Sequence, residues 1–175
     1  MENYEKISAE GVNENAAKLI GQGWMLITAG NEKLFNSMTA SWGTLGHLWN
    51  KNIATIFIRP QRYTKEFVDK ESVFTLSFFK EIYRPALQIY GTKSGRDCDK
   101  VKEAGITPIA TPNASIAFSQ AYMVMECKKL YAATINESSF LGSSIVSEIY
   151  PQKDFHDFYI GEILGTYIKI GKNNG

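Results

Sequence analysis

Short runs of β-forming residues recur along the whole chain, and they restrict its fold more than any other feature of the sequence. Gly161 and Gly165 interrupt the last run, which indicates a bulge or a corner there. In the fourth run Phe74, Leu76 and Phe78 alternate with smaller residues, so one face of this strand is expected to pack in a core. The first two runs are joined by a Gly-Asn-Glu turn and predict a hairpin. The six runs are 24–29, 34–41, 53–58, 73–79, 122–130 and 158–170.

Short helical patterns separate these runs. Gly91 and Gly105 follow two of them and are expected to end those helices as left-handed C-caps, and Pro151 stops the last one. Short strands, glycine corners and peripheral helices predict a mainly β fold, a small antiparallel barrel with no open strand edge rather than a doubly wound sheet. The expected helices are 15–20, 64–70, 84–90, 97–104 and 138–149.

The composition predicts one globular domain over residues 1–175, with 44% hydrophobic and 21% charged residues. Cys98 and Cys127 are the only cysteines and form no metal-binding motif, so we expect neither a disulfide scaffold nor a zinc site, and a cytoplasmic location. The net charge of +1 predicts no nucleic-acid partner. The polar N-terminus does not resemble a signal peptide, and the longest apolar run, 53–58, is too short to span a bilayer, so no membrane association is expected.

Aromatic residues make up 13% of the chain, which fits either a β-rich core or a flat aromatic ligand. Common catalytic signatures are missing from the sequence. There is no GxSxG and no GxxxxGK[ST], and Gly21-Gln22-Gly23 lacks the third glycine of a dinucleotide fingerprint. His47 and His156 are too few and too far apart for a metal triad, so no metal site is predicted.

Three segments have the composition of a ligand site. In the first, small and hydroxylated residues surround Trp42, so that a backbone can approach a flat ligand while the indole covers one face. The alternative is a Ser/Thr-rich strand end with a tryptophan in the core. The segment contains Asn36, Ser37, Met38, Thr39, Ala40, Ser41 and Trp42.

The second segment follows the strand predicted at 53–58. Pro60 stops that strand, and Thr64 is expected to cap a helix that begins at Lys65, beside Arg59 and Arg62. A helix N-terminus, a hydroxyl and two guanidinium groups together favour a phosphate site. The alternative is a solvated basic turn.

The third segment, 91–100, is a Gly/Ser loop that leads into a helix. Its backbone amides, with Arg96 or Lys100, are expected to bind the same phosphate or ribityl hydroxyl groups. A mobile surface loop is the alternative interpretation.

Together, five motifs in order resemble the flavin reductase-like, flavoredoxin-type family over roughly residues 20–170. They are NxMTASWG at 36–43, RPxRYT at 59–64, TLSFF at 75–79, SGRDxDK at 94–100 and HxxxxGEI at 156–163. The resemblance implies an FMN-binding split β-barrel, a homodimer with FMN near the subunit interface, and two-electron chemistry at the flavin. The family often shows a variety of charged or aromatic residues at the barrel mouth, and the Tyr-Ala-Ala-Thr stretch at 131–134 has little of that variety, so partner specificity is not carried over.

The resemblance also implies roles for individual residues. Residues 36–42 would lie along the isoalloxazine ring and the ribityl chain. Arg59, Arg62 and Thr64 would bind the phosphate, and Ser94 and Lys100 would complete the pocket. Among the aromatic residues, Trp42, Tyr63 and Phe79 are assigned to the flavin. His156 would donate a proton or a hydrogen bond at the pocket mouth, or else be a surface or interface histidine between Asp154 and Asp157.

The sequence therefore predicts an FMN-binding oxidoreductase that reduces bound flavin with NADH or NADPH. One alternative is an FMN electron carrier that a partner protein reduces. Another is a non-catalytic flavin-binding protein, or a module that holds a different planar ligand such as pyridoxal phosphate or haem.

Overall fold

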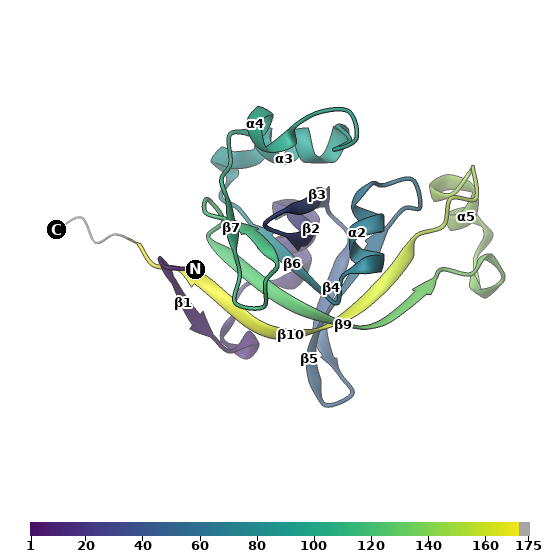
Figure 1. The fold of residues 1–175 in the computed structure, drawn as a ribbon. Coiled ribbons are helices and arrows are strands. Elements are labelled where there is room, and N and C mark those ends of the chain that lie inside the picture. The colour runs from purple at the N-terminus through teal and green to yellow at the C-terminus, as the bar shows by residue number, and fades with distance from the viewer. Residues whose placement is uncertain (172–175) are drawn as a thin grey trace.

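The computed structural model describes residues 1–171, and its main element is a curved eight-stranded antiparallel sheet with helices around it (Figure 1). The strand order is β3-β2-β6-β9-β10-β5-β4, and β1 pairs with β10. The strands are β1 Tyr4–Ile7, β2 Met25–Asn31, β3 Leu34–Ala40, β4 Gly43–Leu48, β5 Lys51–Ile58, β6 Val73–Phe78, β9 Met123–Thr134 and β10 Asp157–Lys169. A separate two-stranded sheet contains β7 Pro108–Ala110 and β8 Ile116–Phe118.

The six strands expected from the sequence are present as β2, β3, β5, β6, β9 and β10, and the mainly β architecture is confirmed. The sequence did not predict β1, β4, β7 or β8, which are short or rich in small residues. The expectation of a barrel with no open edge is wrong, because β3 and β4 form the two ends of the strand order. The outer edge of β3 faces helix α3 instead of another strand.

Strand β10 connects the two halves of the sheet. It pairs with β9 along most of its length, with β5 from Asp157 to Glu162, and with β1 from Thr166 to Lys169. Its register with β9 shifts next to Gly161 and again before Gly165, as the sequence predicted. A side chain at Gly161 would lie 2.7 Å from the ring of Phe74, so the bulge needs glycine at this position.

Five α-helices are described, and their bounds differ in part from the prediction. Helix α2 has the expected bounds, and Gly105 ends α4 with a φ of 65°. Gly91 is not a C-cap, because α3 continues through it to Thr92. The predicted first helix is split into α1 and a π-helical turn, Leu19–Gly23, and α5 begins later than expected, after a 3-10 turn at Glu137–Ser139. The helices are α1 Ala16–Lys18, α2 Thr64–Lys70, α3 Arg84–Thr92, α4 Lys100–Ala104 and α5 Ser143–Ile149.

Two clusters of buried side chains stabilise the fold, one on each face of the sheet. The first lies inside the curve, where Phe67 and Val68 of α2 pack against Phe74, Leu76 and Phe78 of β6. The second lies between the sheet, α3 and β8. The smaller residues of β6 are therefore also buried: the hydroxyl of Thr75 donates to the carbonyl oxygen of Ile116 on β8 at 2.5 Å.

Candidate functional site

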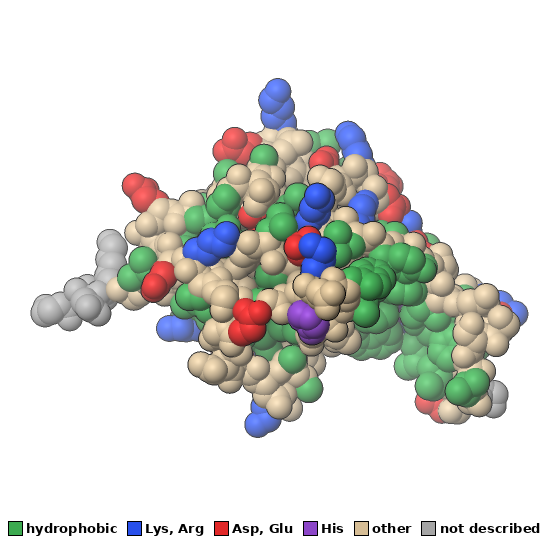
Figure 2. Space-filling model, turned by 90° about the horizontal axis from the view of Figure 1, so that it is seen from below, with side chains coloured by type: hydrophobic (Ala, Val, Ile, Leu, Met, Phe, Trp, Pro, Cys, Tyr) green, Lys and Arg blue, Asp and Glu red, His purple; other side chains and the backbone are tan. Residues whose placement is uncertain are grey.

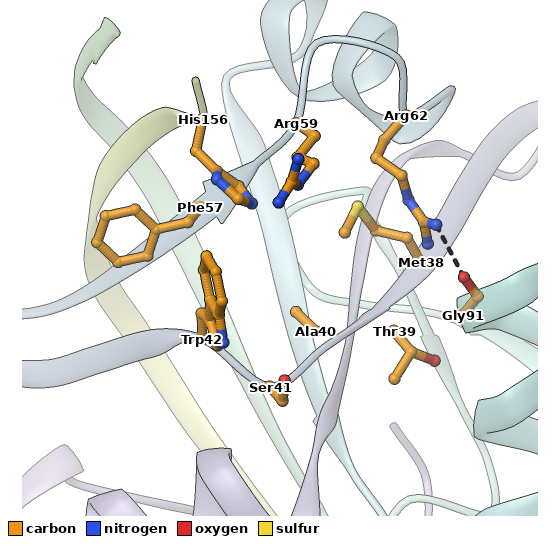
Figure 3. A pocket seen from close by; sticks show the side chains of 10 residues that line it. All are labelled: Met38, Thr39, Ala40, Ser41, Trp42, Phe57, Arg59, Arg62, Gly91 and His156. Carbon is orange, nitrogen blue, oxygen red and sulfur yellow. Dashed lines mark hydrogen bonds between the residues drawn. The ribbon is translucent and has the colours of Figure 1, made fainter. Parts of the chain in front are cut away.

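A first cavity of about 230 Å³ lies where β3 and β5 end. Phe57 and Arg59, two positions apart at the end of β5, both line it. The rings of Trp42 and His156 face each other with centroids 5.0 Å apart. In Figure 3 these four side chains lie at one end of the cavity, and Arg62 lies at the other. The complete lining is Met38, Thr39, Ala40, Ser41, Trp42, Phe57, Arg59, Arg62, Gly91 and His156.

A second cavity of about 180 Å³ adjoins the first at Met38 and Arg62, which line both. It lies between β3, the loop from β5 into α2, and the loop from α3 to α4. Its walls are mostly polar. The complete lining is Asn36, Met38, Gln61, Arg62, Tyr63, Thr64, Thr92, Lys93, Ser94 and Lys100.

Thr64 does not cap α2. The N-cap position is Tyr63, and no side chain caps the helix there. Instead, the Thr64 hydroxyl accepts a hydrogen bond of 2.8 Å from the side-chain amide of Asn36 on β3. The sequence motif identified the correct segment but the wrong contact, because the partner is 28 residues away along the chain.

Arg62 lines both cavities, and its side chain contacts the last turn of α3. Its guanidinium group donates to the carbonyl oxygens of Gly91 at 2.8 Å and Tyr90 at 3.2 Å. Carbonyl groups in the last turn of a helix lack partners within the helix and attract cations. This contact explains why α3 extends through Gly91 without a glycine cap. Burial lowers the pKa of Arg62.

Lys100 is another cation of the second cavity and is buried, with only 6% of its surface exposed. Its ammonium group donates to the carbonyl oxygen of Ser37 and lies 5.1 Å from the centre of the Tyr90 ring. Burial, and secondly the positive charge of Arg62, lower the pKa of Lys100 to about 8. Among residues 1–171, no carboxylate forms an ion pair with Arg62 or Lys100. The second cavity therefore has uncompensated positive charge.

Arg59 is in a different environment. It forms an ion pair with Asp154, donates to the carbonyl oxygen of Ile149 at 2.9 Å, and lies over the ring of Tyr150 at 5.4 Å. It lines the first cavity and not the second. The structure thus places Arg59 and Arg62 in the first cavity, but only Arg62 shares the second cavity with Lys100.

His156 is almost fully buried beside Trp42, with 7% of its surface exposed. Its Nδ1 is 2.9 Å from the hydroxyl oxygen of Tyr150. Burial, and secondly the positive charge of Arg59, lower the pKa of His156 to about 4. The imidazole is therefore neutral at pH 7. It can exchange hydrogen bonds in the cavity, but it does not carry the extra proton of an imidazolium acid.

The two cavities collect most of the residues that the sequence assigned to a site, with two exceptions. The Ser37 side chain is buried in the sheet, where its hydroxyl is 2.8 Å from that of Thr28. Phe79 packs in the second core cluster against Tyr83 and Phe118, away from both cavities. Tyr63 lines the second cavity, with the guanidinium group of Arg96 4.4 Å from its ring centre.

Sequence reasoning missed the wall residue Phe57 and assigned Gly91 to the phosphate segment rather than to the first cavity. Phe57 was assigned only to a buried strand, although its position two residues before Arg59 places both on the same face. Gly91 was interpreted as a helix cap and as the start of the segment 91–100. A side chain there would lie 3.5 Å from Thr39 and narrow the first cavity.

Two kinds of feature are absent from residues 1–171. No helix in this part of the chain is long and apolar enough to cross a membrane. In the same residues, no three His, Cys, Asp or Glu side chains are grouped so that they could hold a metal ion.

Comparison with known proteins identifies relatives of this fold. A search of curated proteins returned no match to the chain. An FMN-binding domain of a flavin reductases-like enzyme from Shewanella baltica has a TM-score of 0.68 and 15% identity, over 95% of this chain and 78% of that chain. Flavoredoxin of Desulfovibrio vulgaris (Miyazaki F) has a TM-score of 0.65 and 18% identity, over 96% and 78%. An NADH:FAD oxidoreductase from Streptomyces globisporus C-1027 has a TM-score of 0.61 and 14% identity, over 82% and 73%.

Membership of a family follows from the comparison of the sequence with protein-family models. The model of the flavin reductase like domain matches residues 17–174, which is nearly the whole chain. The chain therefore belongs to the flavin reductase-like family.

Proposed function

We propose that this chain binds FMN across the two adjoining cavities and acts as an oxidoreductase that receives hydride from a reduced nicotinamide. The observation that carries the proposal is the position of buried Lys100 and half-buried Arg62, which have no carboxylate partner among residues 1–171, next to a cavity with aromatic walls. A planar ring matches the aromatic cavity, and a phosphate at the end of a flexible chain matches the adjoining cavity that holds the two cations.

The second cavity fits the phosphate. A buried lysine whose pKa falls to about 8 is stabilised when an anion binds beside it. Arg62 still has N–H groups to donate after binding two carbonyl oxygens, and Thr64 and Ser94 add hydroxyl groups. Lys93 also lines the cavity, with its ammonium group paired to Glu103.

The first cavity fits the ring. Trp42 and Phe57 provide aromatic surfaces, while Ala40 and Gly91 leave room for the backbone to approach. The Ser37 carbonyl oxygen accepts a hydrogen bond from Lys100, so this group faces the outer edge of β3, away from β2. Because backbone groups alternate direction along a strand, those of Thr39 face the same way and are available to the edge of a ring.

When bound, FMN supplies a ring that accepts and releases electrons in pairs. The chain binds and orients this ring: Arg62 and Lys100 hold the phosphate, and Trp42 shields one side of the ring from water. His156 offers its second ring nitrogen, Nε2, for a hydrogen bond. Arg59 places a positive charge beside Trp42 and His156.

The electron donor is proposed to be NADH or NADPH, which would stack on the exposed side of the ring. The structural similarity to an NADH:FAD oxidoreductase supports this donor class. The similarity to flavoredoxin favours the second candidate, an FMN electron carrier that another protein reduces.

We also propose that the functional unit is a homodimer. Aromatic rings form a row from Trp49 at the β4–β5 turn through Tyr131 and Phe158 to Phe57 in the first cavity. Figure 2 shows hydrophobic side chains gathered on the side of the molecule where α5 lies. A second copy covering this row would also cover the cavity mouth. Light scattering with Tyr131→Glu and wild type tests this: the variant is expected to be monomeric.

Flavin binding is tested by titrating the purified protein with FMN and with riboflavin, followed by the quenching of flavin fluorescence. FMN is expected to bind more tightly because riboflavin lacks the phosphate. Rapid mixing of the FMN complex with NADH or NADPH should then bleach the flavin absorbance. No bleaching with either nucleotide would favour the electron carrier, and equal binding of FMN and riboflavin would refute the phosphate site.

A further inference from the structure

The segment between β9 and β10 reaches back to the first cavity and holds Arg59. Asp154 accepts an ion-paired hydrogen bond from one arm of the guanidinium group, and the Ile149 carbonyl oxygen accepts one of 2.9 Å from the other. Asp154 is itself fixed by the side-chain amide of Gln61, which donates to the same carboxylate oxygen at 3.0 Å. Neither Asp154 nor Ile149 lines the cavity.

Arg59 extends from these contacts toward the cavity. In Figure 3 its guanidinium group lies beside His156 and above Trp42, at the aromatic end. Among residues 1–171, its Nε has no hydrogen-bond acceptor. The charge of Arg59 is therefore next to the space assigned to the ring, whereas the charges of Arg62 and Lys100 are next to the space assigned to the phosphate.

We propose that Asp154 is a positioning residue that lowers the reduction potential of the bound flavin by neutralising part of the charge of Arg59. This inference rests on the proposed function, because it requires flavin in the first cavity. Hydride transfer from a nicotinamide brings two electrons and one proton to the ring, and the donor leaves as the oxidised nicotinamide. The ring then carries one more negative charge than before.

A positive charge beside the ring favours its reduced form, and a negative charge favours its oxidised form. Arg59 is closer to the ring than Asp154, which binds the far side of the guanidinium group. Arg59 and Asp154 together therefore produce a weaker positive potential at the ring than Arg59 would produce alone. The other carboxylate near this end, Asp157, is paired with Lys65 at 2.8 Å, and His156 is neutral, so neither replaces the effect of Asp154.

The test is the midpoint potential of bound FMN, measured by reductive titration against a reference dye. Asp154→Asn keeps the shape of the side chain and removes its charge. At a fixed ambient potential, the ratio of reduced to oxidised flavin is expected to rise about threefold to tenfold. A tenfold rise corresponds to about 30 mV for a two-electron couple. Asp154→Glu keeps the negative charge, so its midpoint potential is expected to stay near the wild-type value.

A matched control is Glu162→Gln, which removes a carboxylate paired with Lys51 at 2.7 Å, on β10 but outside both cavities. Its potential should stay near that of wild type. Arg59→Gln should shift the ratio in the opposite direction from Asp154→Asn, which a loss of packing alone would not produce. If Asp154→Asn does not fold, a wild-type potential in Arg59→Gln would still overturn the inference, because the effect of Asp154 acts through the charge of Arg59.

Equal potentials in Asp154→Asn and Glu162→Gln, or shifts of the same sign in Asp154→Asn and Arg59→Gln, would overturn the inference. Failure of the wild-type protein to bind FMN would instead refute the proposed function. The two failures are distinguishable, because binding is measured before any potential.

Discussion

Three of the cations that line the cavities, Arg59, Arg62 and Lys100, differ in how their charge is compensated. Arg59 has a carboxylate partner within the chain, Asp154, and lines the aromatic cavity. Lys100 is buried and Arg62 is half-buried; both donate to carbonyl oxygens, pair with no carboxylate among residues 1–171 and line the polar cavity. A buried charge without a counter-charge destabilises a protein, so it is expected where a ligand supplies the opposite charge. This contrast separates the end of the site proposed for the phosphate from the end proposed for the ring.

The largest expected effect comes from Arg62. Arg62→Ala should weaken FMN binding by about 1.5 to 3 kcal/mol, because a charge-assisted bond to the phosphate is lost. Riboflavin binding should change little. Both affinities are measured by fluorescence titration. The matched control is Arg96→Ala, which removes a nearby arginine that already pairs with Glu66 and should have a small effect on either ligand. Equal losses for both flavins would place Arg62 away from the phosphate.

Lys100 should show a conflict between stability and binding. Lys100→Met removes a buried charge, so the ligand-free protein is expected to gain about 1 to 2 kcal/mol in free energy of unfolding at pH 7, measured in urea. The same change should weaken FMN binding about tenfold. Lys102→Met, an exposed position on the same helix, should change neither quantity. A destabilised Lys100→Met protein would show that its bond to Ser37 matters more than its burial.

The pH dependence follows from the pKa of Lys100, which is about 8 in the folded chain. Above this pH the ligand-free protein loses the Lys100 proton, while the phosphate favours the protonated form. FMN affinity should therefore fall above pH 8, by at most tenfold per pH unit, and binding should take up a proton. Calorimetry in buffers of different ionisation enthalpy measures this uptake. Riboflavin serves as the control, and an FMN affinity that is flat to pH 9.5 would contradict the assignment.

The pKa of Lys100 also predicts how stability varies with pH in the absence of ligand. The folded-state pKa of about 8 is below the unfolded value, so between pH 8 and about 10.5 the unfolded chain binds more protons. This contribution makes the wild type more stable as the pH rises through that window. The stability advantage of Lys100→Met should shrink over the same range, as followed by urea unfolding at several pH values.

Thr64 should have a smaller effect. Thr64→Val removes the hydroxyl that accepts from Asn36, and leaves a buried amide group without its partner. We expect a loss of about 1 to 2 kcal/mol in free energy of unfolding and a several-fold loss of FMN affinity. Thr44→Val, an exposed position on β4, provides the control. Unchanged stability in Thr64→Val would show that the Asn36 contact is not important.

The smallest phosphate-specific effect is expected at Arg59. Arg59→Met should change the affinities for FMN and riboflavin by the same factor, because its charge is at the ring end. Paired titrations give the ratio of the two affinities, which should stay within about threefold of the wild-type ratio. A selective loss of FMN binding would return Arg59 to the phosphate and remove the contrast between the two cavities.

The sequence predicted the strands well because their patterns are local. The alternation of Phe74, Leu76 and Phe78 placed one face of β6 in the core, as observed. It did not predict that Thr75 and Ser77 would be buried as well, because β8 covers that face from about 40 residues away. Long-range covering of this kind leaves no periodic signal in the strand itself.

The site was predicted at the level of segments rather than contacts. The three segments do meet at the two cavities, but Thr64 contacts Asn36 instead of capping α2, and Arg59 is held by Asp154. Phe79 had the expected residue type but packs in the core, because its neighbours Tyr83 and Phe118 lie there. Residue type and local spacing do not specify which partner a side chain meets across the fold.

The position of β10 has a consequence for the order in which the protein can form during synthesis. β5 and β4 pair with each other, and β10 is their only link to the remaining strands of the sheet within residues 1–171. On the ribosome, this hairpin has no place in the sheet until residues 157–169 have emerged. Phe57 and Arg59 reach their final positions only then, so the wall of the first cavity that they form is completed late in synthesis.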